Sequence, residues 1–294
     1  MIDRQQFHAI LELARREDLG AGADLTSLLL PASASRAVGS WRLAARQAGR
    51  FCGGEILPAM LESLAPEVHL DRLKPRCDKE PLAAGEEIAV LTGVACQMLA
   101  AERTILNFLQ RLSGVATLTS RFVSAVAGTH AKIYDTRKTT PGLRTLEKYA
   151  VRCGGGHNHR LGLYDAVLIK DNHLAGIPLD RFAHAVSEML GRVEALPSRP
   201  AFVEVEVDGL DQLAELLKVV GVDVILLDNF SEEGLVAAVE MRNRAGLRGK
   251  VELEASGGAN LANVRAIAET GVERIAVGAI THSAVSLDLG LDAL

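Results

Sequence analysis

Beyond about residue 115, short apolar runs alternate with longer amphipathic stretches. The apolar runs predict strands at 131–135, 166–170, 202–207, 223–228, 251–256 and 274–278. The amphipathic stretches predict helices near 118–127, 142–153, 179–194, 209–220, 231–245 and 260–270. This alternation is typical of a parallel sheet with right-handed crossovers. Because the units are too compact for a complete eight-fold barrel, we expect a shortened or incomplete α/β barrel, with an open doubly wound sheet as the alternative.

The first part of the chain has a less regular pattern. Apolar spacing predicts a helix at 7–17 and a second helix at 97–113, and alternating residues predict strands at 37–46 and 86–92. The mixture indicates a separate α/β domain that precedes the regular one.

Each predicted strand of the second part ends in a chemically active side chain or a glycine. These strand ends are Asp135-Thr136-Arg137-Lys138, Lys170-Asp171-Asn172-His173, Glu204 and Glu206, Asp228-Asn229, Glu254-Ala255-Ser256-Gly257-Gly258, and Gly278. In barrels and open α/β sheets, the carboxyl ends of the strands form the edge where ligands bind. A capping or turn role explains any one of these groups but is a poor explanation for all of them. We therefore expect them to converge on one mouth.

Charge is distributed unevenly along the 294 residues, whose formal net charge is -5. The stretch from Arg137 to Lys170 holds seven Lys or Arg and two acids, a local +5. An acidic protein with a local cationic island is suited to a small anionic ligand and not to nucleic acid, which needs a broad basic surface. Alternatively, Arg144, Lys148 and Arg152 line a solvated helix face.

Composition and the chain start exclude other classes. With 48% hydrophobic and 23% charged residues, the chain is globular and not disordered or fibrous. The longest uncharged stretch, the 14 residues at 88–101, is too short to span a membrane. The start lacks the features of a secretory signal, and the four cysteines form no C-x-x-C pair. We expect a cytoplasmic protein with reduced thiols.

Four of the strand ends favour phosphate or metal chemistry. The turn at 256–258 offers bare amides before a predicted helix, and Gly278 adds a second backbone approach point, as in the phosphate sites of barrels. Glu206 and Asp228 provide the hard oxygen ligands that suit Mg²⁺ or ribose hydroxyls. Glu204 has the same side-chain parity as Glu206 and competes for that role.

The segment 154–160, Gly-Gly-Gly-His-Asn-His-Arg, allows close backbone approach. Its two histidines permit a metal site, but no cysteine or acid accompanies them at zinc spacing. We favour His159 and Arg160 as planar donors to a carboxylate. Further cations follow neighbouring strands, namely Arg137, Lys138 and Lys170. Together they exceed what one phosphate requires, so the ligands should carry several anionic groups.

An ordered set of motifs resembles the quinolinate phosphoribosyltransferase family over residues 17–284. The motifs are ERT at 102–104, LNFLQRLSGVAT at 106–117, DTRKTTPGLR at 135–144, GGGHNHR at 154–160, LIKDNH at 168–173, VEVE at 203–206, LLDNF at 226–230 and EASGG at 254–258. The resemblance implies an N-terminal α/β sandwich domain, 1–114 completed by 282–294. It also implies an incomplete α/β barrel of the second phosphoribosyltransferase type at 115–281.

The same resemblance implies an activity and an assembly. The activity is transfer of phosphoribosyl from phosphoribosyl pyrophosphate (PRPP) to quinolinate with decarboxylation, which yields nicotinate mononucleotide, CO₂ and pyrophosphate for NAD synthesis. The assembly is a homodimer, with higher oligomers left open, in which the N-terminal domain of the partner subunit closes the barrel mouth.

Residue roles also follow from the resemblance. Arg103 would reach the mouth of the partner subunit. Quinolinate carboxylates would be held by Arg137, His159, Arg160 and Lys170. PRPP would be held by Lys138, Ser256, Gly257, Gly258 and Gly278. Glu206 and Asp228 would serve ribose hydroxyls and Mg²⁺, and they join Lys138 as the expected catalytic groups.

Three other functions compete with this interpretation. A related phosphoribosyltransferase acting on another small aromatic acid would need fewer cations. A Schiff-base aldolase would use Lys170 as its nucleophile and would require a neutral amine. A non-catalytic phosphate sensor would leave Glu206 and Asp228 unexplained.

Overall fold

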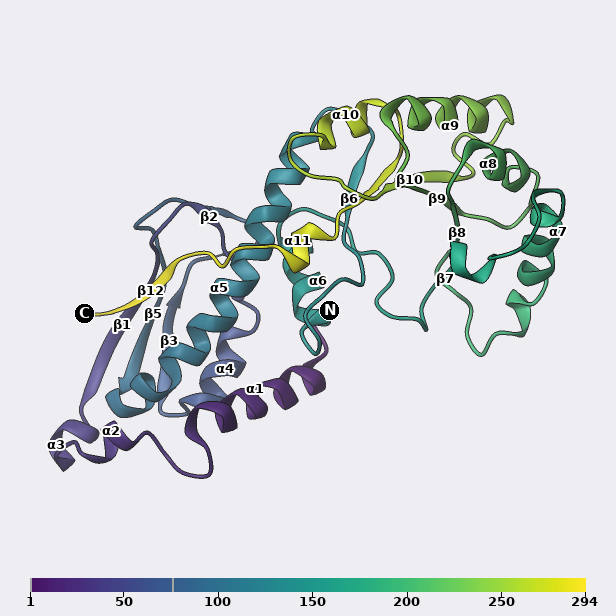
Figure 1. Ribbon diagram of the computed structural model, residues 1–294. Helices are drawn as coiled ribbons and strands as arrows, with labels where there is room; N and C mark the ends of the chain where they lie inside the picture. The colour runs from purple at the N-terminus through teal and green to yellow at the C-terminus, as the bar shows by residue number, and fades with distance from the viewer. Residues whose placement is uncertain (1, 76) are drawn as a thin grey trace. The chain divides into compact units, whose positions relative to one another are not determined.

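The structure is a computed structural model that describes residues 2–75 and 77–294 (Figure 1). Its internal contacts divide the chain into two compact units. The first unit consists of Met1–Ser120, Thr139–Gly155 and Thr281–Leu294, and the second of Arg121–Lys138 and Gly156–Ile280. The exact domain boundaries expected from the sequence, at 114 and 281, stay a prediction.

The second unit is built on a six-stranded parallel sheet. Its strands are β6 (Lys132–Tyr134), β7 (Val167–Ile169), β8 (Val203–Val207), β9 (Val224–Asp228), β10 (Glu252–Ser256) and β11 (Arg274–Ala276). Their spatial order is β6-β11-β10-β9-β8-β7, and all pairs are parallel. Every strand predicted for this part is present. Because the sheet of described strands ends at β6 and β7 without closing, the expected incomplete α/β barrel is confirmed.

Helices connect these strands. They are α7 (Leu179–Leu190), α8 (Leu210–Leu216), α9 (Glu232–Arg244) and α10 (Val264–Glu269), with the short 3₁₀ turns η1 (Asp171–His173) and η2 (Val193–Ala195). Successive helices pack on one another, α7 on α8, α8 on α9 and α9 on α10. Crossovers of one hand place successive helices side by side in this way.

Side chains alternate between the two faces of the parallel strands. Odd-numbered residues are apolar and buried, among them Val203, Val205, Val207, Ile225, Leu227, Leu253 and Ile275. Even-numbered residues carry the polar groups, among them Glu204, Glu206, Asp228, Glu254 and Ser256. Since strand side chains have a period of two, one face of this sheet is an apolar core and the other is chemically active.

The first unit contains an antiparallel sheet in the order β12-β1-β5-β3. Its strands are β1 (Val38–Ala45), β3 (Val68–Leu73), β5 (Glu87–Val94) and β12 (Leu289–Ala293), with the short pair β2 (Gly49–Arg50) and β4 (Pro81–Leu82) apart. Its helices are α1 (Arg4–Leu19), α2 (Leu25–Leu28), α3 (Ala32–Ser35), α4 (Leu57–Leu64), α5 (Ala95–Ala125) and α6 (Arg144–Cys153). Figure 1 shows α1, α4 and α5 beside the sheet. The expected α/β sandwich is confirmed.

The C-terminal segment belongs to this first unit. Strand β12 pairs along β1, where Leu43 faces Leu291. The α5 motif holds the segment in place, because Gln110 Nε2 donates to the Leu289 carbonyl at 2.8 Å and the Leu287 amide donates to the Gln110 carbonyl at 3.0 Å. Gln110 belongs to the motif at 106–117, so part of this motif serves to hold the C-terminal segment against α5.

The predicted break between two helices at 113–118 was wrong, because α5 runs through it without interruption. Gly114 has another purpose. A Cβ at this position would lie 2.1 Å from the Val285 carbonyl oxygen and 3.0 Å from the Ser286 Cα. The glycine is needed where the backbone of the C-terminal segment crosses the helix closely.

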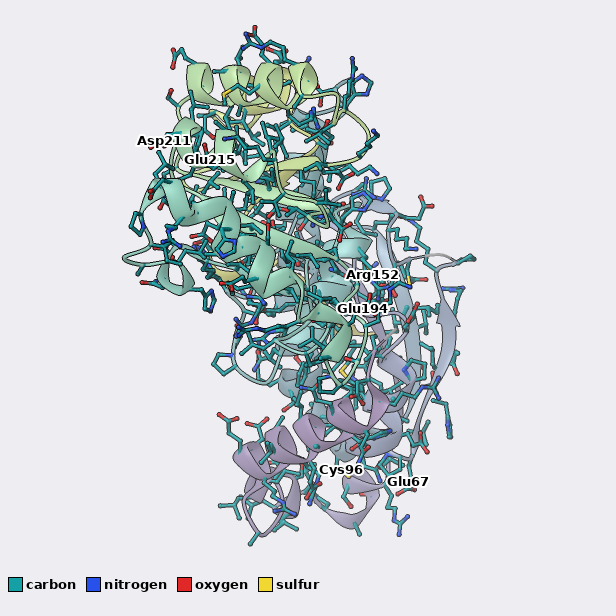
Figure 2. The ribbon with its side chains drawn as sticks, turned by 90° about the vertical axis from the view of Figure 1, so that its right-hand side faces the viewer. Glu67, Cys96, Arg152, Glu194, Asp211 and Glu215 are labelled. Carbon is teal, nitrogen blue, oxygen red and sulfur yellow. The ribbon has the colours of Figure 1, made fainter. Side chains whose placement is uncertain are left out.

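Helix α6 also differs from expectation. Lys148, expected on a solvated face, is 1% exposed, whereas Arg152, labelled in Figure 2, is exposed. Glu147 is fully buried and accepts hydrogen bonds from Arg111 Nη2 at 2.7 Å and from Thr140 Oγ1 at 2.8 Å. Most of α6 is buried, namely residues 146–151 and Cys153, so the helix has only a narrow solvated face.

Among residues 2–75 and 77–294, none of the helices combines the length and the apolar character that crossing a membrane requires.

We predict that Gly114→Ala destabilises the chain, although alanine favours a helix by about 1 kcal/mol over glycine. The new methyl group clashes with backbone atoms, which costs roughly 1–3 kcal/mol or more. The midpoint of thermal unfolding should therefore fall. Gly22→Ala is the control, since its Cβ would meet no atom closer than 4.0 Å. An unchanged or raised midpoint for Gly114→Ala would contradict the close crossing.

Candidate active site

A cavity of about 510 Å³ opens at the carboxyl ends of the parallel strands in the second unit. Almost all the residues singled out from the sequence line it, namely Arg137, Lys138, His159, Arg160, Lys170, Glu206, Asp228, Ser256, Gly257 and Gly258. The expected convergence on one mouth is thus observed, and the roles of these residues toward a ligand stay predictions.

Two predicted site residues lie elsewhere. Arg103 is exposed on α5 in the first unit. Gly278 lies in the second unit between β11 and the short helix α11 (Ala279–His282), and it is not among the residues that line the cavity. Any role of Arg103 in a partner subunit's cavity stays a prediction.

Strand register explains why distant residues meet here. Glu206 on β8 pairs with Leu226 on β9, which pairs with Glu254 on β10. One step toward the mouth, Asp228 pairs with Ser256. The alternation of side chains then directs each of these residues to the same face.

Three acidic side chains gather at the mouth. The carboxylates of Glu206, Asp208 and Asp228 place one oxygen each within 4.8 Å of one another. Burial raises the pKa of Asp208, and the charges of Asp171 and Asp228 add to this effect. Sequence reasoning missed Asp208, although it shares the parity of Glu206. A hard cation such as Mg²⁺ fits this set of oxygen donors.

Lys170 is linked to this acidic group. Its ammonium donates to Glu206 Oε2 at 2.7 Å, and its side chain is 45% exposed. An ammonium held by a carboxylate acts as a binding group and not as a nucleophile, so this contact disfavours the Schiff-base alternative.

The turn after β10 depends on glycine. Gly257 and Gly258 have φ angles of +93° and +64°, and a Cβ at Gly257 would lie 2.0 Å from Asn229 Oδ1. Asn229 also donates from its amide to the Ser256 carbonyl at 2.9 Å. The prediction that a helix starts near residue 260 was wrong, since α10 begins at Val264.

The side chains of the intervening asparagines explain this late start. The Ala262 amide donates to Asn260 Oδ1 at 2.9 Å, and the Asn260 amide donates to Asn263 Oδ1 at 2.8 Å. These bonds form turns that compete with the helix. The glycine turn therefore offers its own amides to a ligand without a helix end directly behind it.

The glycine- and histidine-rich loop is tied to the free edge of β6. The His157 amide donates to the Ile133 carbonyl at 2.8 Å, and the Asp135 amide donates to the His157 carbonyl at 3.1 Å. Asp135 is fully buried and its two oxygens accept from the His159 amide at 2.8 Å and from Asn158 Nδ2 at 2.6 Å. The loop thereby fixes the positions of His159 and Arg160.

His157 has a structural place in this loop. Its ring lies 5.3 Å from the ring of Tyr134, and burial lowers its pKa, helped by the charges of Lys132 and Arg274. Of the two loop histidines, only His159 belongs to a group of close metal-ligand atoms among the described residues. A shared zinc site of His157 and His159 is therefore not supported.

His159 is 7% exposed and has charged neighbours on one side. Its Nε2 lies 2.8 Å from Glu204 Oε2 and 3.4 Å from Glu254 Oε1, while Nδ1 accepts from the Arg160 amide at 2.8 Å. One neutral hydrogen bond contributes about 1 kcal/mol, and a bond to a charged group roughly 2. Burial lowers the pKa of His159, but Glu204 and Glu254 outweigh burial and raise the pKa to about 9.

Arg160 supplies a buried cation at the cavity. The residue is 7% exposed, and its Nη1 donates to the Ala166 carbonyl at 3.5 Å. Burial lowers the pKa of Arg160, and the charge of Arg137 lowers it further. Two guanidinium groups that repel one another are stabilised by an anion between them.

A second cavity of about 540 Å³ lies beside β7. Its lining is mainly apolar, and Arg160 is the one predicted site residue it shares. It lacks the convergent charges that orient an anionic substrate.

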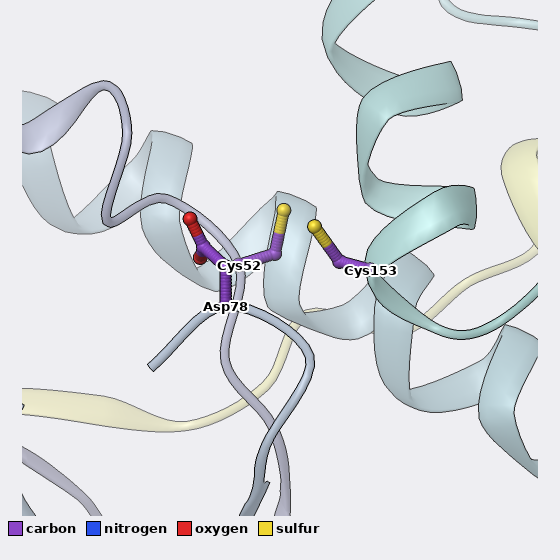
Figure 3. Close-up of side chains that lie close together, drawn as sticks. All are labelled: Cys52, Asp78 and Cys153. Atoms are coloured by element: carbon purple, nitrogen blue, oxygen red, sulfur yellow. The ribbon is translucent and has the colours of Figure 1, made fainter. Parts of the chain in front are cut away.

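Two cysteines and an aspartate form another group of close metal-ligand atoms, in the first unit. Figure 3 shows the sulfurs of Cys52 and Cys153 facing each other near Asp78, with ligand atoms within 4.8 Å. The Asp78 carboxylate accepts from the amides of Gly53 at 2.7 Å and Gly54 at 3.0 Å and from the Tyr149 hydroxyl.

The carboxylate of Asp78 is thus engaged by its own fold. Burial raises the pKa of Cys52 well above its usual range, and the neighbouring Cys153 adds to this effect. A thiol kept protonated is a poor metal ligand. The cluster is best explained as packing around the turn at 53–55.

Comparisons with known proteins agree with this geometry. Residues 24–113 match the family described as Quinolinate phosphoribosyl transferase, N-terminal domain, and residues 115–292 match its C-terminal domain. The chain is 41% identical to the nicotinate-nucleotide pyrophosphorylase (carboxylating) of Mycobacterium leprae, over 99% of this chain and 100% of that protein. It is 39% identical to a probable enzyme of the same name from Bacillus subtilis, over 94% of this chain and 89% of that protein.

Solved structures show the same fold over the full chain. The nicotinate-nucleotide pyrophosphorylase of Francisella tularensis superposes with a TM-score of 0.87 at 36% identity, covering 100% of this chain and 98% of that one. The enzyme of Ehrlichia chaffeensis gives 0.85 at 37% identity, covering 98% of each chain. Both domains and the order of the site motifs are thereby accounted for, and the chain belongs to the quinolinate phosphoribosyltransferase family.

Proposed function

We propose that this chain transfers the phosphoribosyl group of PRPP to quinolinate and releases CO₂, forming nicotinate mononucleotide for pyridine nucleotide synthesis. The observation that carries the proposal is the single cavity at the strand ends, which brings four cationic residues together with an acidic group. A substrate with two carboxylates and another with several phosphoryl groups match this charge pattern. The names of the near full-length relatives point to the same reaction.

We assign roles to the residues that line the cavity. Arg137, His159, Arg160 and Lys170 are assigned to the carboxylates of quinolinate. Planar guanidinium groups bind carboxylates through two parallel hydrogen bonds, which orients the pyridine ring. Lys138 and the turn at 256–258 are assigned to the phosphoryl groups of PRPP.

The first chemical step forms a bond from the pyridine nitrogen to C1 of the ribose and breaks the bond from C1 to pyrophosphate, which leaves with the electron pair. Positive charge grows on the sugar, and the carboxylates of Glu206 and Asp228 offset it. Holding both substrates in line removes much of the entropic barrier. Lys138 stabilises the charge on the leaving group.

The second step breaks the bond between ring C2 and its carboxylate. The electron pair stays on C2, beside the positively charged ring nitrogen, and a proton from water then takes its place. The substrate itself stabilises the carbanion, so the residues of the chain only need to hold one carboxylate firmly and leave the other free to depart. Arg160, which is buried and fixed by its loop, suits the first task.

Mg²⁺ is proposed as the metal, held by Glu206, Asp228 and the additional Asp208, and when bound it neutralises charge on the pyrophosphate. A homodimer is also proposed, in which Arg103 reaches the cavity of the partner subunit. The exposed position of Arg103 on α5 supports this assignment. A cytoplasmic location stays a prediction.

The direct test is to incubate the purified chain with quinolinate, PRPP and Mg²⁺ and to measure nicotinate mononucleotide and CO₂. Both products should appear in equal amounts, and nicotinate or other pyridine acids should react far more slowly. A preference for another acid would replace quinolinate as the substrate, and no product at all would overturn the proposal.

We predict that Glu206→Gln and Asp228→Asn each raise the Mg²⁺ concentration needed for half-maximal activity by about tenfold or more. Each should also reduce turnover by about 10². Asp211→Asn is the control, because Asp211 is an exposed acid on α8 outside the cavity (Figure 2). Activity that persists in excess chelator, with unchanged Mg²⁺ dependence in both variants, would count against a metal at this position.

We predict that Arg103→Ala and Lys138→Ala each reduce turnover by about 10² or more while thermal unfolding stays unchanged. If the sites are shared, each mixed dimer regains one working site. An equal mixture of the two variants, unfolded and refolded together, should then recover about a quarter of the wild-type activity. Lys250→Ala, an exposed lysine outside the cavity, is the control. Mixtures that stay as inactive as the separate variants would exclude the shared site.

A further inference from the structure

Behind the cavity lies a buried group of four ionisable side chains that the reaction described above does not use as a unit. Glu204 and Glu254 are fully buried, and His159 and Arg274 are 7% and 5% exposed. His159 Nε2 approaches both carboxylates, at 2.8 and 3.4 Å, and Arg274 Nε lies 2.7 Å from Glu254 Oε2. Two strands, β8 and β10, direct their acids inward at these positions.

The carboxylates have few other partners. None of the four oxygens of Glu204 and Glu254 accepts a well-directed hydrogen bond among the residues that the structure describes. Buried carboxylates of this kind depend on neighbouring cations. Arg274 neutralises one negative charge. Burial and the charge of Glu254 raise the pKa of Glu204, so the second charge is offset either by a proton on Glu204 or by a charged His159, whose Nε2 lies 2.8 Å away.

Other charged groups surround His159 at greater remove. Asp135, after β6, accepts from its main-chain amide. Further charged residues line the cavity around it, namely Arg137, Lys138, Arg160, Lys170, Glu206 and Asp228. The cations among them disfavour protonation of the His159 imidazole, whereas the carboxylates of Glu204 and Glu254 favour it. Because these carboxylates are buried and in contact with Nε2, their effect is screened least.

A bound metal ion explains the two buried carboxylates less well than a charged His159 does. His159, Glu204 and Glu254 have ligand atoms close enough to hold one. However, Arg274 already occupies one side of Glu254 and stacks over the Tyr134 ring at 4.0 Å, which fixes its guanidinium there. A divalent cation beside this guanidinium would be repelled.

We propose that Glu204 and Glu254 are positioning residues that hold His159 as an imidazolium at the cavity wall, so that the site presents one more fixed positive charge to an anionic substrate. This inference rests on the proposed function for the identity of the substrate, but the charge state of His159 is a property of the free protein. The same contacts have an electrostatic effect, since the two carboxylates outweigh burial and raise the pKa of His159 to about 9.

The consequence for binding has a definite direction. A doubly ionised pyridine dicarboxylate binds the charged imidazole better than the neutral one. Its apparent affinity then scales with the fraction of protein in which His159 is charged. Affinity should be constant below pH 8 and should weaken as the pH rises through about 9.

The first experiment measures this charge directly. The full chain is labelled with ¹³C at the histidine Cε1 positions and titrated by NMR, and the His159 signal is assigned from its absence in His159→Asn. We expect His159 to titrate with a pKa near 9 in the wild-type protein. Titration of the wild-type signal near the ordinary histidine value, about 6.5, would overturn the proposal.

Two substitutions should shift this titration in opposite directions. Glu254→Gln removes a carboxylate and should lower the pKa of His159 by about 1 to 3. Arg274→Gln removes the competing cation and should raise it. Glu252→Gln is the matched control, because Glu252 lies on the same strand, has a side chain 48% exposed and contacts Arg274 but not His159. Equal titration curves for Glu254→Gln and Glu252→Gln would refute the positioning role.

The second experiment follows the Michaelis constant for quinolinate. In Glu254→Gln it should stay within about twofold of wild type at pH 6 and rise about tenfold at pH 8.5, with a smaller change in kcat. A merely structural defect would raise it equally at both pH values and would contradict the inference. A wild-type chain that shows the raised pKa but makes no nicotinate mononucleotide would overturn the proposed function alone.

Discussion

The parallel pairing of β8, β9 and β10 is the interaction on which the rest of the site depends. Main-chain hydrogen bonds fix the register, so that Glu206, Leu226 and Glu254 share one level and Asp228 and Ser256 share the next. A slip of one residue on any of these strands would turn its carboxylates into the apolar layer and its buried apolar residues toward the mouth. The apolar residues of the opposite face thus hold the chemistry in place.

This constraint also explains which features sequence reasoning recovered. The six parallel strands were predicted because each is a short apolar run, and the convergence of polar groups followed from the common direction of the strands. The resemblance to a known family then supplied roles that spacing could not. Asp208 was missed because it lies one residue beyond the predicted strand at 202–207. Glu254 was named at the end of its strand but was given no role, because Ser256, Gly257 and Gly258 lie nearer the mouth.

Other errors came from long-range packing that no local pattern reveals. Gly114 looked like a helix break but marks the crossing of a segment more than 170 residues away, at Val285. Lys148 looked like a solvated residue because its type favours water, yet the neighbours of α6 bury it. The late start of α10 reflects side-chain bonds of Asn260 and Asn263 that compete with the helix.

The return of the C-terminal segment to the first unit has a consequence for biosynthesis. Strand β1 (Val38–Ala45) is synthesised long before its partner β12 (Leu289–Ala293). Until then, one edge of the antiparallel sheet presents unpaired amides and carbonyls, which other chains bind readily. The parallel sheet, whose strands are complete by residue 276, is finished before that edge is covered. During synthesis the antiparallel sheet of the first unit is therefore completed only after all strands of the parallel sheet have been made.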